Sequence, residues 1–219
     1  MIEANLEWRR FIARAGKTHY RDEIGIGARP GPLRLQIGPR KPRRLLYFTK
    51  RSLPEVWSGA TELPGDLAIF WESWFSSRQS CDLLIRYTRE VGRPFFFVGD
   101  LTPIGLTRFA DLRSRGVPVR YLGIDDRWLQ LCRQYWRPFG TLKSWHSIIL
   151  QLDDTGLEHL ALVNRLLPDL ERLIGPECFA LLQSGQSLQL EGAGLPHHFR
   201  KPFLPALTHL LLGSSKSLK

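Results

Sequence analysis

Apolar runs alternate with polar segments of helical length along the middle of the chain. Four runs are expected to be strands: RLLYFT (44–49), LAIFWE (67–72), PFFFVGD (94–100) and VPVRYLGID (117–125). Apolar residues at helical spacing predict helices in the segments between and after them: 76–92, 103–116 and 126–136. Strands alternating with helices in this way indicate βαβ units. The expected fold class is therefore α/β, with a mainly parallel, Rossmann-like sheet flanked by helices.

The two ends of the chain have a different pattern. We expect an amphipathic helix at 3–15 and one alternating strand, LRLQI, at 33–37. The segment 155–175 has helical spacing interrupted at Pro168, which predicts a kinked helix or two helices. A short helix at 175–185, a small edge strand or turn near Leu188, and an apolar helix with a basic tail at 201–219 should follow. These patterns divide the chain into a basic N-terminal extension (1–44), an α/β core (45–150) and a helical C-terminal segment that completes the domain (151–219).

Several acids stand where predicted strands end. Glu72, Asp100 and the pair Asp125 and Asp126 hold such positions, and ligands of parallel sheets collect beyond the carboxyl ends of the strands. An aspartate at the start of a helix has a second explanation, because it can cap free backbone N–H groups. That alternative applies to Asp125 and Asp126 above all. Glu72 closes an apolar strand, where a carboxylate is less expected.

Composition favours a globular protein with a polyanionic partner. Apolar residues make up 43% and charged residues 24% of the chain, and no apolar run approaches the roughly 20 residues needed to cross a bilayer. The formal net charge of +10 favours nucleic acid as the partner. The shortness of the apolar runs predicts no membrane partner. The basic segment 29–44 is either an extended nucleic-acid-binding arm or hairpin edge, or a solvated loop. The candidate nucleic-acid-binding residues are Arg40, Lys41, Arg43, Arg44, Lys143, Arg200 and Lys201.

Cysteine usage indicates a reducing compartment. Cys81, Cys132 and Cys178 lack the close spacing of zinc sites or of a disulfide framework, and three buried thiols are expected. The N-terminus has no pattern of a secretory signal. We therefore expect a cytoplasmic protein.

Carboxylates at neighbouring strand ends would repel one another unless a cation lay between them. Mg²⁺, or Mn²⁺, suits oxygen ligands and leaves coordination positions for phosphate. A metal held in this way can activate water or polarise a phosphodiester. In a basic protein, such a site would favour phosphoryl chemistry on nucleic acid.

The segments LAIFWESWFSS (67–77) and FFFVGDLTPIGLTRFADLRSRGVPVRYLGIDD (95–126) resemble a Toprim domain, the metal-binding module of topoisomerases, primases and related nucleases. The similarity is greatest to the branch that holds the A subunit of topoisomerase VI and the Toprim nuclease subunit of Wadjet-type plasmid-defence systems. In that branch the second motif has the form G-D-x-D-P-x-G. The resemblance covers roughly residues 45–196, and GPECFALLQSGQSLQLEGAGLP (175–196) is similar to the closing segment of the Wadjet-type subunit.

The resemblance implies roles for individual residues. Glu72 and Asp100 would be catalytic metal ligands, Thr102 and Asp126 would complete the metal site, and Asp125, Glu191 and Gly105 would support it. Thr102 stands where the family has its second aspartate, so divalent-cation affinity should be lower. Two functions follow: a Mg²⁺-dependent DNA-cleaving subunit of a DNA-processing or defence complex, or a catalytically inactive Toprim-like scaffold that binds DNA or a partner protein.

Overall fold

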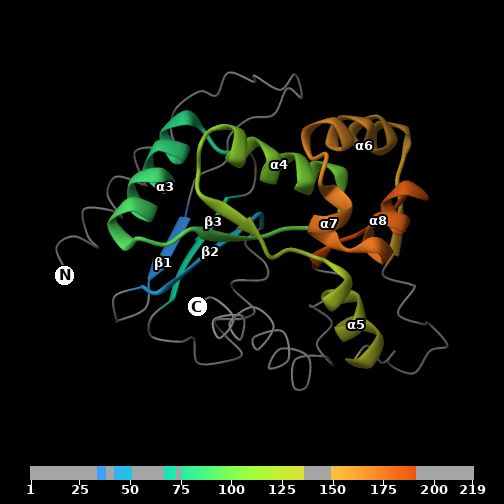
Figure 1. The fold of residues 1–219 in the computed structure, drawn as a ribbon, viewed down its shortest axis with the longest axis horizontal. Helices are drawn as coiled ribbons and strands as arrows, with labels where there is room; N and C mark the ends of the chain where they lie inside the picture. The colour runs from blue at the N-terminus through green and yellow to red at the C-terminus, as the bar shows by residue number, and fades with distance from the viewer. Residues whose placement is uncertain (1–33, 38–41, 51–66, 73–74, 136–148, 191–219) are drawn as a thin grey trace. The chain divides into compact units, whose positions relative to one another are not determined.

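The computed structural model describes residues 34–37, 42–50, 67–72, 75–135 and 149–190 (Figure 1). These residues fall into two compact units. The first unit holds the described residues up to Val98 together with residues 108–121. The second holds residues 99–107 and the described residues from Leu122 onward.

The first unit contains a five-stranded sheet with the order β1-β3-β2-β4-β5. The strands are β1 (Arg34–Ile37), β2 (Arg44–Phe48), β3 (Leu67–Trp71), β4 (Phe95–Val98) and β5 (Val119–Tyr121). β2, β3, β4 and β5 are parallel, and β1 runs antiparallel to β3 at the edge. The predicted α/β class with a mainly parallel sheet is confirmed.

Two helices cover one face of this sheet. In α3 (Arg78–Val91), Tyr87 packs edge-on against Phe70 of β3. In α4 (Pro103–Ser114), Phe109 packs against Phe97 of β4. Phe70 and Phe97 both pair in register with Tyr47 of β2, so the two contacts lie on the same side of the sheet.

Local sequence signals explain where α3 begins and ends. The Ser77 side chain accepts a hydrogen bond from the Ser80 backbone N–H at the N-terminus. Gly92 ends the helix in the left-handed conformation (φ 70°), which glycine adopts without steric cost. Both boundaries agree with the helix predicted over 76–92.

The second unit is mainly helical. Its elements are α5 (Asp126–Tyr135), β6 (Ile149–Gln151), α6 (Asp154–Leu166), α7 (Leu170–Ile174), α8 (Pro176–Gln183) and β7 (Gln186–Leu188). The interruption at Pro168 separates α6 from α7. Of the two expected alternatives, a kinked helix or two helices, the structure has two helices. β7 pairs with β6 as an antiparallel two-stranded sheet, which confirms a small strand near Leu188. β6 itself was not predicted.

Two of the three cysteines are described, and both are free, buried thiols as expected. Burial raises the pKa of the Cys81 thiol to about 12 and that of Cys178 well above its ordinary range. The side chain of Cys132 and the helices predicted at 3–15 and 201–219 lie outside the described residues. Among the helices that are described, none has the length and apolar character to cross a membrane.

Candidate functional site

Glu72 follows β3 directly and is completely buried. Three hydroxyl groups donate hydrogen bonds to its carboxylate. Tyr47 and Ser76 donate to Oε2 at 2.9 and 2.6 Å, and Ser80 donates to Oε1 at 3.3 Å. Both carboxylate oxygens of Glu72 are therefore already bound by side chains of the first unit.

Burial raises the pKa of Glu72 to about 7, because removing a carboxylate from water disfavours its charged form. The hydroxyl donors and the positive charge of Arg108 oppose this rise, since both favour the ionised carboxylate. A carboxyl group that titrates near neutrality is common in active sites. Here the group has no surface exposed, so a substrate atom cannot reach it without movement of its neighbours.

Arg108 is the positively charged residue that acts on this carboxylate, and it is 7% exposed. Its guanidinium donates to the backbone oxygen of Thr49 at 2.8 Å and to that of Glu72 at 2.7 Å. These carbonyls come directly after β2 and β3, so one arginine of α4 ties together the carboxyl ends of two parallel strands. The positive charge of Arg108 also offsets the negative charge of the ionised Glu72 carboxylate.

Sequence reasoning identified Glu72 but not the four residues that surround it. Ser76 and Ser80 follow Glu72 at intervals of four residues, which is a weak signal for a shared side of the chain. Tyr47 and Arg108 come from other elements, 25 and 36 residues away in sequence. Only the strand pairing and the packing of α4 bring them to Glu72.

Asp100 belongs to the second unit and is 5% exposed. Its Oδ1 accepts a hydrogen bond of 2.8 Å from the backbone N–H of Leu190. The next residue, Leu101, exchanges two backbone hydrogen bonds with Leu188, at 2.9 and 3.0 Å. Asp100 thus holds the chain that follows β7.

The cap of α4 is Thr102. Its hydroxyl oxygen accepts a hydrogen bond of 3.1 Å from the Gly105 backbone N–H, and Pro103 occupies the first helical position. A Cβ atom on Gly105 would lie 2.7 Å from the backbone oxygen of Asp100, so only glycine fits. Local geometry therefore accounts for the threonine, proline and glycine of the GDLTPIG motif.

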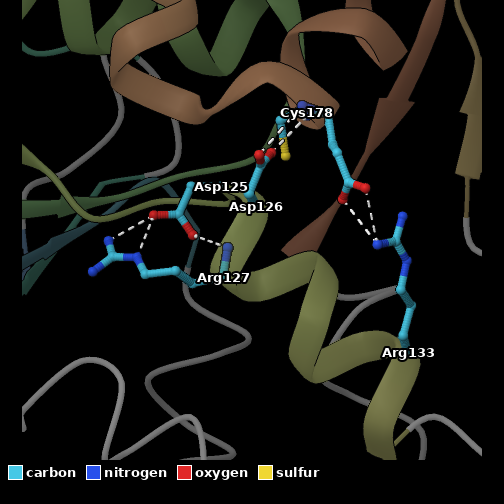
Figure 2. Close-up of polar contacts among 6 residues, drawn as sticks. Asp125, Asp126, Arg127, Arg133 and Cys178 are labelled. Atoms are coloured by element: carbon cyan, nitrogen blue, oxygen red, sulfur yellow. Dashed lines mark hydrogen bonds and ion pairs between the residues drawn. The ribbon is translucent and has the colours of Figure 1, made fainter.

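Asp125 and Asp126 have different partners (Figure 2). Asp125 Oδ1 accepts from the backbone N–H groups of Arg127 and Trp128, and its Oδ2 pairs with the Arg127 guanidinium at 2.6 Å. Asp125 therefore caps α5, which agrees with the alternative explanation for an aspartate at a helix start. Asp126 points instead at α8, where Oδ1 accepts from Cys178 N at 2.9 Å and Oδ2 from Glu177 N at 3.3 Å.

The proposed metal ligands are divided between the units. Glu72 lies in the first unit, whereas Asp100, Thr102, Asp125 and Asp126 lie in the second. Within the described part of the chain, no group of three or more His, Cys, Asp or Glu side chains is placed to hold a metal ion. Glu191 lies outside the described residues. A Mg²⁺ or Mn²⁺ site at Glu72 and Asp100 stays a prediction.

Among the candidate nucleic-acid-binding residues, Arg43 and Arg44 are described. Arg44 begins β2, and Arg43, which precedes it, is exposed. Five others lie outside the described residues: Arg40, Lys41, Lys143, Arg200 and Lys201. No protein-family model and no curated protein matches this chain.

Proposed function

We propose that the protein is a Toprim-related nucleic-acid-binding protein in which the acidic positions stabilise the fold and do not cleave phosphodiesters. The observation that carries the proposal is the state of Glu72. Its carboxylate is fully buried, and both of its oxygens accept hydrogen bonds from hydroxyl groups. A divalent cation would have to displace these donors and enter a region without exposed surface.

The relation to Toprim domains is supported by the order of elements. Glu72 follows β3, the pair Gly99 and Asp100 follows β4, and α4 begins at Pro103 immediately afterwards. β3 and β4 are both parallel to β2. This is the sequence of strand, acid and helix that the resemblance implies for the family.

Nucleic acid is supported as the partner by charge. The chain carries 31 Lys and Arg against 21 Asp and Glu. The carboxylates of Asp125 and Asp126 accept hydrogen bonds from helix N-termini. These two acids therefore do not create an acidic surface that would repel phosphate. A net positive charge of this size attracts the phosphate backbone, and the attraction weakens as salt is added.

The second candidate function is Mg²⁺- or Mn²⁺-dependent hydrolysis of DNA with Glu72 and Asp100 as ligands. The pKa of Glu72, raised to about 7, favours it, because such shifts are frequent in catalytic carboxyl groups. It requires Glu72 to exchange its hydroxyl donors for a cation, and Asp100 to release the Leu190 amide.

Incubation of supercoiled plasmid with the purified chain in Mg²⁺ or Mn²⁺ separates the two functions. We expect no metal-dependent nicking by the parent protein. Nicking that is lost in Asp100→Ala, and retained in the exposed-residue control Asp82→Asn, would overturn the non-cleaving assignment. Thr102→Asp restores the family's second aspartate while keeping a residue that caps helices well. Nicking gained by that variant would support descent from a metal-dependent ancestor.

Binding is tested on the same preparations by fluorescence anisotropy with a labelled duplex. We expect an association constant that falls steeply between 50 and 200 mM salt, as phosphate contacts require. A chain that does not bind single-stranded or duplex nucleic acid at about 50 mM salt would contradict the proposed function.

A further inference from the structure

The first unit has an open pocket of about 490 Å³, and none of the described site residues predicted from the sequence lines it. It lies where α3 ends and where β4 and β5 begin. Its lining residues include Arg89, Gly92, Arg93, Pro94, Pro118 and Arg120. This is the amino-terminal edge of the parallel strands, opposite to the edge at which Glu72 follows β3.

Three arginines from three backbone segments line this pocket. Arg89 is in the last turn of α3, Arg93 follows the helix cap, and Arg120 is the central residue of β5. All three are exposed, and none forms an ion pair with a residue in the described part of the chain. Among the described residues that line the pocket there is no acid. Glu90, the neighbour of Arg89 in sequence, is exposed but does not contribute to the lining.

Backbone hydrogen bonds connect the segments that carry these arginines. Gly92 turns the chain out of α3, and the N–H groups of Gly92 and Arg93 both donate to the Thr88 oxygen, at 2.8 and 3.2 Å. The Phe95 N–H then donates to the Pro118 oxygen at 2.8 Å, which joins the two proline-containing segments. Backbone hydrogen bonds therefore link the segments that form the pocket walls.

The arginine pocket continues toward the basic segment predicted from the sequence. β2 is the neighbour of β4, and Leu45 pairs in register with Phe95. Arg43 and Arg44 consequently lie at the same edge of the sheet as Arg93. Adjacent strands are about 4.8 Å apart, so the basic residues form a row across β2, β4 and β5.

We infer that this row, centred on the pocket of Arg89, Arg93 and Arg120, binds the phosphates of a nucleic-acid backbone; the inference rests on the proposed nucleic-acid-binding function. Guanidinium groups bind phosphate oxygens through paired N–H donors, and they remain charged at all working pH values. The C-terminus of α3 opposes an anion with only about half an elementary charge. Three full positive charges outweigh it. The site reads backbone charge and shape, so it carries no sequence preference.

The test compares two variants with the same loss of charge. The pocket variant is Arg89→Gln, Arg93→Gln and Arg120→Gln. The control variant changes three exposed arginines elsewhere: Arg78→Gln, Arg165→Gln and Arg172→Gln. Arg78 lies at the other end of α3, about 16 Å from Arg89 at 1.5 Å per helical residue. Circular dichroism and urea unfolding establish that both variants are folded.

Binding of labelled 20-nucleotide single-stranded DNA, duplex DNA and RNA is measured by anisotropy from about 50 to 300 mM KCl. For duplex DNA, each lost phosphate contact lowers the slope of log K against log salt by about 0.9. We expect the pocket variant to lose about 2 to 3 from that slope and to bind roughly tenfold or more weakly near 100 mM salt. The control variant should retain the parent slope. The three probes show whether the bound backbone is single-stranded, duplex or RNA.

The outcomes separate this inference from the proposed function. If the parent binds nucleic acid and the pocket and control variants have equal slopes, the phosphate site is wrong and the function stands. If the parent binds no nucleic acid, both are wrong. If the pocket is needed only for binding phosphatidylserine vesicles, the inference is overturned because the ligand is a lipid surface.

Discussion

The carboxylate of Asp126 lies at the N-terminus of α8, with its Oδ1 2.9 Å from the backbone nitrogen of Cys178 (Figure 2). Asp126 is the first residue of α5, so the start of one helix caps the start of another. A negative charge at this end of α8 also opposes the positive end of the helix dipole. The contact gives Asp126 a structural role that does not involve metal.

Loss of this contact should destabilise the second unit. We expect Asp126→Ala to lower the free energy of unfolding by about 1 to 2 kcal/mol, the range measured for strong helix caps. Hydrogen exchange should be accelerated at the Glu177 and Cys178 amides in particular. Asp82→Ala, at an exposed position on α3, is the control. Unchanged exchange at both amides would contradict the cap.

Gly175 should not tolerate any side chain. Its backbone angles, φ 89° and ψ 158°, lie in a region that is nearly exclusive to glycine and costs other residues about 1 to 3 kcal/mol. A Cβ atom there would also lie 2.3 Å from Cγ of Asp126. We expect Gly175→Ala to destabilise the protein more than Asp126→Ala does, measured by urea unfolding.

The two positions should be coupled. In the Asp126→Ala background the carboxylate is gone, so Gly175→Ala should cost only its backbone strain. The double-mutant cycle should therefore show a smaller effect of Gly175→Ala than in the parent. Additive effects would mean that the carboxylate does not limit the space at Gly175.

Glu72 should make stability depend on pH. Its pKa is raised from 4.5 in the unfolded chain to about 7 in the folded protein. Between these values the folded state holds a proton that the unfolded state has lost, so the free energy of unfolding falls as pH rises through this window. The total change is roughly 3 kcal/mol at most, at 1.36 kcal/mol per pKa unit.

Glu72→Gln should remove this dependence. Glutamine offers an oxygen to the Tyr47 and Ser76 hydroxyls, and a hydroxyl can turn to accept from its amide group. Urea unfolding at pH values from about 5 to 8 should show a flatter profile than the parent, with greater stability at pH 8. Glu90→Gln, at an exposed position, should keep the parent profile. The same slope in Glu72→Gln as in the parent would contradict the pKa assignment.

Arg108 should contribute strongly to the stability of the sheet edge where β2 and β3 end. Arg108→Met leaves the Thr49 and Glu72 carbonyls without their guanidinium donors, and an unsatisfied buried polar group costs about 1 to 3 kcal/mol. We expect a loss of at least about 2 kcal/mol in the free energy of unfolding. The pKa of Glu72 should also rise further, because Arg108 lowers it. Arg113→Met on the same helix, an exposed residue with a cation–π contact to Phe109, is the control.

The apolar runs predicted the parallel sheet because the central strands are buried, and each buried strand is an unbroken run of mainly apolar residues. β2, β3 and β4 each coincide with such a run. Ser77 and Gly92 mark the two ends of α3, because one caps the N-terminus and the other adopts the left-handed conformation. β6 escaped prediction because it has three residues and is partly exposed, so it lacks a buried run. Its pairing with β7 depends on chain 37 residues away.

The acids could be found from sequence, but their partners could not. Asp126 caps a helix that begins 50 residues later, and the Glu72 carboxylate is bound by Tyr47 from another strand. Such pairings arise from tertiary packing, to which spacing within one element gives no guide. Thr102 is the exception, since a threonine before a proline that opens a helix is a local capping signal.

The hydrogen bond from Leu190 to Asp100 joins residues 90 positions apart in the chain, and the isolated β-bridge between Leu101 and Leu188 lies beside it. During synthesis, the segment that starts at Gly99 must therefore wait on the ribosome until β7 has emerged before it gains its partner. Closing so long a loop delays this step relative to local helix formation. Nascent chains truncated before Leu188 should remain vulnerable to proteases at residues 99–107, even where α3 and the strands before it have already folded.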